Sequence, residues 1–135
     1  MLYRKLGSTG EKVSILGLGC MRLPIMNGQY NKVDDDRAIS LIQKAIDSGV
    51  NYLDTAYPYH NGQSETVIAN ALKEGYRDKV FIADKLPSWL IQKRTDMDQY
   101  LEKQLERLQT KQIDFYLLHS VKEDYRSNQE SLGVL

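Results

Sequence analysis

The chain has 135 residues, which is the length of one domain, and its 41% apolar and 27% charged residues are typical of a folded globular protein rather than a disordered one. Eighteen basic and eighteen acidic side chains balance, so no net charge favours nucleic acid or an acidic membrane as a partner. Cys20 is the only cysteine, which excludes an internal disulfide and favours a reducing compartment.

The N-terminal part of the chain has neither a membrane-spanning nor a secretory pattern. The longest apolar run, residues 13–21, is about half of the ~20 residues that a spanning helix needs, and Arg22 follows it. Arg4 and Lys5 are followed by glycine and polar residues, without the apolar core and cleavage site of a signal peptide. We therefore expect no membrane partner and a cytoplasmic location.

The first third of the chain predicts a hairpin, a strand and a helix. Two short extended pieces flank a Ser-Thr-Gly turn at residues 8–10, and a strand is expected near residues 15–18. After a loop, residues 34–36 are acids that favour a helix start, and Gly49 ends that helix. Its expected buried face recurs at helical spacing: Ala38, Leu41, Ile42, Ala45 and Ile46.

The rest of the chain repeats the strand-then-helix pattern. Strands are expected at residues 50–56, 79–85 and 113–119. Ser64 is expected to cap the second helix and Thr95 the third, and the residues after 130 look like the start of another element. The expected buried faces of these two helices are Val67, Ile68, Ala71 and Leu72, and then Met97, Leu101, Leu105 and Leu108.

Strands that alternate with helices, at a repeat of roughly 30 residues, predict parallel βαβ units of an α/β protein. Asp54, Lys85 and His119 end three consecutive strands of this pattern. Because the chemistry of parallel α/β proteins gathers at the C-terminal ends of strands, these side chains are expected to converge on one rim, with Tyr59 in the loop beside them.

These four residue types can together protonate a carbonyl group. A phenol has an ordinary pKa near ~10, and an adjacent ammonium lowers it by favouring the phenolate. A carboxylate holds the ammonium charged and in place, and a histidine orients a carbonyl or passes a proton. Each residue alone also has a structural interpretation, as a turn former, a packed tyrosine, a solvated lysine or a satisfied histidine. Their equivalent places in successive βα units favour the functional one.

Three stretches that carry these residues, "NYLDTAYPYHNGQSE", "VFIADKLPSW" and "IDFYLLHS", resemble the aldo/keto reductase family. The resemblance is greatest to the bacterial branch whose full-length members carry an iron–sulfur tail, and it covers essentially the whole chain. It implies a catalytic tetrad of Asp54, Tyr59, Lys85 and His119. It also implies a (β/α)₈ barrel whose floor is plugged by the N-terminal hairpin.

The resemblance further implies NADP(H) as hydride donor and a small carbonyl compound as substrate. Met21 and Arg22 match a family segment near the nicotinamide ribose, and Asp54 borders the same region, so all three are cofactor candidates. Trp89 either lines the substrate pocket or packs on its own loop. The iron–sulfur cluster is not expected, because the chain lacks the cysteines of the family's tail.

The chain departs from the family in length. A full barrel needs about 250 residues, whereas this sequence supplies about the first four βα units. We therefore expect a partial TIM barrel, a truncated aldo/keto reductase domain over residues 1–135. Its exposed strand edges would allow a homodimer.

A second departure is Asp84, where the family usually has threonine. Strand alternation turns Asp84 toward the helix layer and Lys85 inward. Because a buried carboxylate without a partner is destabilising, we expect Asp84→Thr to stabilise the chain.

Other candidate motifs are weaker. "GLGCMR" lacks the third glycine and the following helix of a dinucleotide fingerprint, and no metal-ligand spacing occurs. Cys20 is expected to be a buried small hydrophobe, and His60 to belong to a solvated loop that could shape the pocket entrance.

The sequence thus predicts an NADPH-dependent reductase of aldehydes or ketones with Tyr59 as general acid. Two alternatives stay open: an inert half barrel that only self-associates, and a binding subunit.

Overall fold

The order of elements in the computed structural model, which describes residues 1–121, is a hairpin followed by alternating parallel strands and helices, as predicted. The strands are β1 (Tyr3–Lys5), β2 (Lys12–Ser14), β3 (Leu18–Gly19), β4 (Tyr52–Asp54), β5 (Phe81–Leu86) and β6 (Phe115–Leu118). The helices are α1 (Asp35–Asp47), α2 (Gln63–Ala71) and α3 (Arg94–Leu108), with 3₁₀ turns at Cys20–Arg22, Tyr59–Gly62, Arg77–Lys79 and Ser88–Leu90. The element predicted after residue 130 lies outside the described residues.

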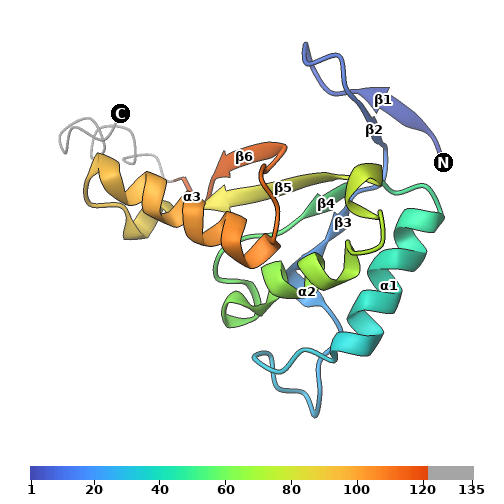
Figure 1. Cartoon of the computed structure of the whole chain (residues 1–135), viewed down its shortest axis with the longest axis horizontal. Helices are drawn as coiled ribbons and strands as arrows, with labels where there is room; N and C mark the ends of the chain where they lie inside the picture. Colours follow the sequence, from blue (N-terminus) through green and yellow to red (C-terminus); the bar gives the residue numbers. More distant parts are fainter. Residues whose placement is uncertain (122–135) are drawn as a thin grey trace.

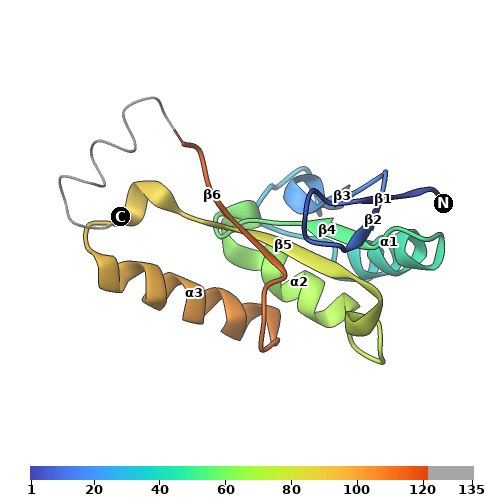
Figure 2. The same cartoon turned by 90° about the horizontal axis from the view of Figure 1, so that it is seen from above.

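The four central strands form one parallel sheet in the order β3-β4-β5-β6. Helices α2 and α3 lie side by side along one face of it, and α1 packs next to α2 (Figures 1 and 2). A helix follows each of β3, β4 and β5 and returns the chain to the end of the sheet where the next strand begins, which is the repeated unit of a (β/α)₈ barrel.

The N-terminal hairpin is tied to the end of the sheet where the parallel strands begin. β1 and β2 pair antiparallel, and Asn51, just before β4, accepts a hydrogen bond from the Ser14 backbone N–H at 2.7 Å. The Asn51 side chain also donates to the Lys12 carbonyl at 2.9 Å, and the Tyr3 hydroxyl donates to the Gly49 carbonyl at 2.9 Å. The hairpin therefore leaves the opposite end of the sheet, where the strands finish, free for the candidate site (Figure 1).

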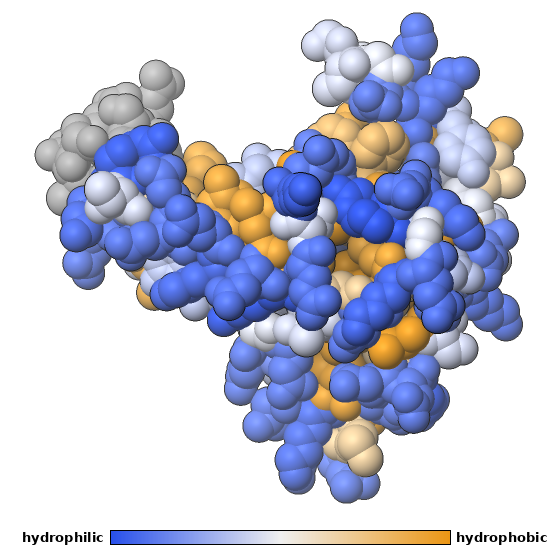
Figure 3. All heavy atoms as spheres, viewed as in Figure 1, coloured by the Kyte–Doolittle hydropathy of each residue, from blue (hydrophilic) through white to orange (hydrophobic). Residues whose placement is uncertain are grey.

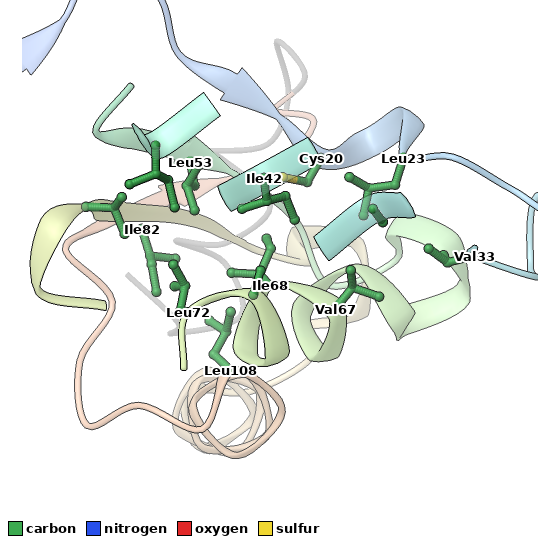
Figure 4. Packing of buried hydrophobic residues seen from close by; sticks show 14 residues of the cluster. Cys20, Leu23, Val33, Ile42, Leu53, Val67, Ile68, Leu72, Ile82 and Leu108 are labelled. Carbon is green, nitrogen blue, oxygen red and sulfur yellow. The ribbon is translucent and has the colours of Figure 1, made fainter. Parts of the chain in front are cut away.

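The hydrophobic core lies between the sheet and its helices (Figure 4). Leu53 and Ile82 from β4 and β5 meet Ile42 from α1 and Ile68 from α2, and all four are fully buried. Leu108 near the end of α3 closes the cluster at 3% exposure. Cys20 also belongs to it with 0% exposure, as expected, and burial raises the pKa of its thiol to about 12, so it is not a ready nucleophile.

The buried faces of the helices follow the predicted spacing fully in α2 and only in part in α1 and α3. Ala38, Ile42 and Ile46 of α1 are buried, whereas Leu41 is 41% exposed. Ile39 packs against the core, so the core contacts the Ile39 side of this helix rather than the Leu41 side. In α2 the predicted residues Val67, Ile68, Ala71 and Leu72 are all buried. In α3 only Leu108 of the predicted face is buried, and Met97, Leu101 and Leu105 are partly exposed.

Several predicted boundaries and caps were wrong. The first parallel strand is Leu18–Gly19 rather than residues 15–18, and Ile15 and Leu16 are exposed. Ser64 does not cap α2, because its hydroxyl is buried and bonds to the Thr55 hydroxyl at 2.9 Å and the Cys20 carbonyl at 3.0 Å.

Thr95 does not cap α3 either. Asp96 takes that function, because its carboxylate accepts the backbone N–H groups of Gln92 at 2.9 Å and Lys93 at 3.1 Å.

The four-stranded sheet is part of a barrel, and within residues 1–121 both β3 and β6 have a neighbour on one side only. On β6, Tyr116, Leu117 and Leu118 are 39–43% exposed. Apolar residues reach the surface beside α3 in Figure 3, where β6 lies in Figure 1. No helix in the described part of the chain is long and apolar enough to cross a membrane.

Candidate active site

The strand register brings the three predicted strand-end residues to one rim. Gly19 of β3 pairs with Asp54 of β4, and β5 continues past β4, so that Lys85 pairs with Leu117 of β6. His119 follows β6 directly, and its backbone N–H donates to the Leu86 carbonyl at 3.0 Å. Asp54, Lys85 and His119 therefore come from three neighbouring strands at the same end of the sheet.

The ammonium of Lys85 is the centre of the site. Its Nζ donates to Asp54 Oδ1 at 2.6 Å and to the Thr55 carbonyl at 2.7 Å. It also lies 3.4 Å from the Tyr59 hydroxyl. The side chain of Lys85 is only 15% exposed, so these acceptors replace most of its water. Together these contacts fix where the cation lies.

Tyr59 reaches the rim from the turn between β4 and α2. His60, Asn61 and Gly62, which follow it, all have positive φ, of 51°, 53° and 88°. Left-handed backbone reverses the chain within three residues, which asparagine and glycine tolerate most readily. This tight turn points the Tyr59 phenol back toward Lys85 while α2 starts behind it.

His119 closes the other side of the site. Its ring is perpendicular to that of Tyr59, with the ring centroids 5.8 Å apart. The Trp89 ring lies 5.1 Å from it between centroids, with 67° between the two ring planes. Its Nδ1 is buried without a hydrogen-bond partner among the described residues. Burial and then the Lys85 charge lower the pKa of His119, so the imidazole is neutral at pH 7 and carries a single N–H.

The remaining predicted site residues surround this group. Met21 and Arg22 lie in the turn that follows β3, next to the end of β4, and both side chains are exposed. Trp89 is 52% exposed and contacts His119 through its ring edge, so the structure places it at the site. All four tetrad candidates are thus brought together, and the cofactor and pocket candidates lie at the same rim.

One prediction about this region was wrong. His60 is fully buried rather than part of a solvated loop. Its ring accepts the Leu23 backbone N–H at 3.1 Å and pairs with the Tyr30 carbonyl at 2.7 Å, and it stacks on the Tyr30 ring at 4.5 Å. A polar loop sequence gave no signal for this, because the partners lie some thirty residues earlier in the chain.

Two further features were missed in the sequence. The Thr55 carbonyl is a ligand of Lys85 that no side-chain pattern reveals, because it is a backbone atom. Glu65 is fully buried and accepts a hydrogen bond from Arg107 at 2.8 Å. The only signal for this pair was an acid at the start of a helix, which reads equally as a favourable interaction with the helix dipole.

Metal binding finds no donor set here. Within residues 1–121, no group of three or more His, Cys, Asp or Glu side chains could hold a metal ion.

A cavity of about 560 Å³ lies at the other end of the strands, between Arg77, Phe81 and Asp114. There the Arg77 guanidinium is occupied by Asp114 at 2.8 Å and the Val80 carbonyl at 2.8 Å, so it has a structural role.

A parallel βαβ repeat in which consecutive strands are neighbours, with polar side chains converging at the C-terminal ends of the strands, is the pattern of β/α-barrel proteins. The Aldo/keto reductase family model matches residues 15–132, and the chain belongs to this family.

Curated relatives agree with this assignment. "Aldo-keto reductase YhdN" of Bacillus subtilis (strain 168) is 35% identical over 127 residues, which cover 88% of this chain and 38% of that protein. "Probable aldo-keto reductase 1" of Glycine max is 35% identical over 126 residues, which cover 87% of this chain and 36% of that protein. The chain therefore spans less than two-fifths of the length of these relatives.

Solved structures show the same fold. The aldo-keto reductase AKR11C1 from Bacillus halodurans in its holo form matches with a TM-score of 0.78 and 29% identity, over 99% of this chain and 48% of that one. An aldo/keto reductase from Klebsiella pneumoniae in complex with NADP and acetate matches with a TM-score of 0.72 and 28% identity, over 91% of this chain and 42% of that one. The chain thus has the fold of about half of such a barrel.

Proposed function

We propose that this chain carries the catalytic half of an NADPH-dependent reductase that converts an aldehyde or ketone to an alcohol. The observation that supports it most is the position of the Lys85 ammonium, which contacts both the Asp54 carboxylate at 2.6 Å and the Tyr59 hydroxyl at 3.4 Å. Family membership and the NADP complex of a related protein support the same reaction class. We assign residues 1–135 to a single reductase domain, and we keep the cytoplasm as the predicted location.

Tyr59 is the general acid of the proposed reaction. Its O–H donates the proton to the carbonyl oxygen while the carbonyl carbon is reduced. The Lys85 cation stabilises the phenolate that this leaves behind, because it lies within hydrogen-bonding distance of the phenol oxygen. Asp54 holds Lys85 charged and in this position.

His119 is the orienting residue rather than the acid. Because its pKa is lowered, the ring is neutral at pH 7 and cannot supply a proton from a cationic state. Its single N–H can instead donate a hydrogen bond to the carbonyl oxygen as negative charge develops there. Trp89, whose ring contacts His119 and is half exposed, forms one wall of the substrate pocket.

The residues at the rim fit a nicotinamide cofactor in part. The buried Nδ1 of His119 has no partner in the described residues, and the Arg22 side chain is exposed beside the end of β4. Met21, Arg22 and Asp54 would hold the nicotinamide side of NADP(H), which supplies a hydride when bound. The chain's own groups then bind the carbonyl, orient it and deliver the proton from Tyr59.

NADPH consumption by the purified chain with a reactive aromatic aldehyde tests the proposal. Tyr59→Phe removes the acidic proton and is expected to lower kcat at least a hundredfold. Tyr57→Phe is the matched control. It removes a phenol hydroxyl from the same loop, but the Tyr57 ring packs on Tyr100 rather than at the site. Equal turnover by Tyr59→Phe and the unmodified chain would contradict the assignment.

A non-catalytic function is the alternative, and the exposed apolar strand β6 favours it. On this view the chain only pairs with a second copy or acts as a binding subunit. Absence of turnover together with a defined oligomer would support it over the reductase.

A further inference from the structure

A buried polar cluster lies behind Lys85, between the sheet and helices α2 and α3. Asp84 of β5, Glu65 of α2 and Gln104 of α3 all have 0% exposure. Polar side chains with no access to water are destabilising unless every donor and acceptor is paired. A cluster of this kind next to a candidate catalytic lysine therefore needs an explanation.

The cluster holds the peptide backbone of Lys85 from both sides. The Lys85 backbone N–H donates to Asp84 Oδ1 at 2.7 Å, and the Lys85 carbonyl accepts from Gln104 Nε2 at 3.1 Å. Gln104 is itself fixed, because its Oε1 accepts from the Tyr116 hydroxyl of β6 at 2.6 Å. Two side chains on the helix-facing side of the sheet thus determine the backbone position from which Lys85 extends toward Asp54 and Tyr59.

The second oxygen of Asp84 meets Glu65. Asp84 Oδ2 and Glu65 Oε1 are both buried without a donor among the described residues, and the two carboxyl groups lie within hydrogen-bonding reach of each other. Two carboxylates cannot face each other in a buried site unless they share a proton. The burial of both groups and their two unpaired oxygens therefore favour one proton shared by the pair.

The proton belongs with Asp84. Burial raises the pKa of Glu65 as well, but Glu65 Oε2 accepts a hydrogen bond from the Arg107 guanidinium at 2.8 Å, which favours the charged form of Glu65 over that of Asp84. Burial first, and then the Glu65 charge, raise the pKa of Asp84 to about 8. The other titratable or charged groups near Asp84 are the Lys85 cation, which lies on the opposite side of β5, and the Tyr116 phenol, whose own pKa is raised by burial.

We propose that Asp84 is a positioning residue for Lys85, whose protonated carboxyl accepts from the Lys85 backbone N–H and donates to Glu65, locking the end of β5 against α2. This rests on the proposed function, because Lys85 is its tuning cation. Loss of the proton places two buried carboxylates side by side and pushes β5 away from α2. Lys85 then moves relative to Tyr59, and small displacements of a catalytic group lower rates strongly.

The activity test compares the pH dependence of kcat in Asp84→Asn, Asp84→Leu and the unmodified chain. A group with a pKa of about 8 is mostly protonated at pH 7 and mostly ionised at pH 9, so kcat is expected to fall about tenfold between them. Asparagine keeps an acceptor for Lys85 and a donor for Glu65 without titrating, so this fall should disappear. Leucine has neither group and should lower kcat at both pH values, with rescue by asparagine.

The control is Asp78→Asn, which removes an exposed carboxylate far from the site and should leave the pH dependence unchanged. An alkaline fall with the same size and the same midpoint in Asp84→Asn would overturn the proposal, because it would then arise from another group such as the Tyr59 phenol.

A second readout does not need turnover. The backbone amide resonance of Lys85 should shift with a midpoint near pH 8 in the unmodified chain and stay constant in Asp84→Asn. A Lys85 amide that does not titrate, or that titrates equally in both proteins, would contradict the proposal. If the unmodified chain shows no turnover, the proposed function fails, and this measurement still decides the role of Asp84.

Discussion

Lys85 has three different oxygen acceptors around one ammonium: a carboxylate, a backbone carbonyl and a phenol. The carboxylate and the carbonyl are closer, at 2.6 and 2.7 Å, and therefore determine where the cation lies. The phenol at 3.4 Å is the looser contact and the one that changes charge during the proposed reaction. This arrangement supports a rigid cation beside a phenol that can release its proton.

Asp84, by contrast, lowers the stability of the folded chain at neutral and alkaline pH. The folded-state pKa of about 8 lies above the ordinary value of 3.8, so folding is most favourable below pH 4 with respect to this group and loses stability as the pH rises toward 8. We expect Asp84→Thr to raise the melting temperature more at pH 8.5 than at pH 5, with a gain of about 1–3 kcal/mol at the higher pH.

Thermal unfolding at the two pH values measures this, with Asp78→Thr as the exposed control. A melting temperature that falls on Asp84→Thr at pH 8.5 would refute the expectation. Because Asp84 is proposed to position Lys85, the stabilised variant should also turn over more slowly, as is common where buried polar groups serve a site.

Among the elements, the turn between β4 and α2 depends most on contacts that are distant in sequence. His60 satisfies the Leu23 N–H and the Tyr30 carbonyl and so ties the loop between β3 and α1 to the residue next to Tyr59. The ring must be neutral for this, with Nδ1–H donating to the carbonyl and Nε2 accepting.

We expect His60→Leu to lower the free energy of unfolding by about 3 kcal/mol, because it leaves two backbone groups unpaired next to the core. Urea unfolding measures this loss. Gln63→Ala is the matched control: its side chain also bonds to this loop, at the Val33 N–H and the Asn31 carbonyl, but in a more exposed place. A loss no greater than that of Gln63→Ala would mean that His60 only fills space.

The elements themselves could be predicted where local signals were strong. The acids at residues 34–36 start α1 as expected, with Asp34 as the cap that accepts the Arg37 N–H at 3.3 Å. The caps of α2 and α3 could not be predicted in this way. The Ser64 hydroxyl bonds to Thr55 and Cys20 instead of capping α2, and the Asp96 carboxylate caps α3 in place of Thr95. A serine before an apolar run fits either a cap or a buried hydrogen bond, and only packing decides between them.

For the whole molecule, the described residues leave an edge on each side of the parallel sheet. Exposed edges with apolar side chains pair readily with another chain, so we propose that the purified chain self-associates. Leu118→Lys on β6 should shift the sedimentation equilibrium toward the monomer, because a lysine on an edge strand opposes strand pairing.

Leu41→Lys on α1 is the control, since Leu41 has a similar exposure, 41% against 43%, but lies on a helix rather than on an edge strand. Equal effects of the two substitutions would indicate non-specific association of apolar surface rather than pairing through β6.

The sequence by itself determined the repeat of strands and helices and the rim on which Asp54, Lys85 and His119 meet. It could do so because parallel strands joined by helices all end on one side of the sheet, whatever their packing. Only the tertiary structure decided that His60 is buried and that Asp84 faces Glu65 across β5 and α2. Those outcomes depend on which side chains from distant segments come together, and a local pattern of residues contains no information about that.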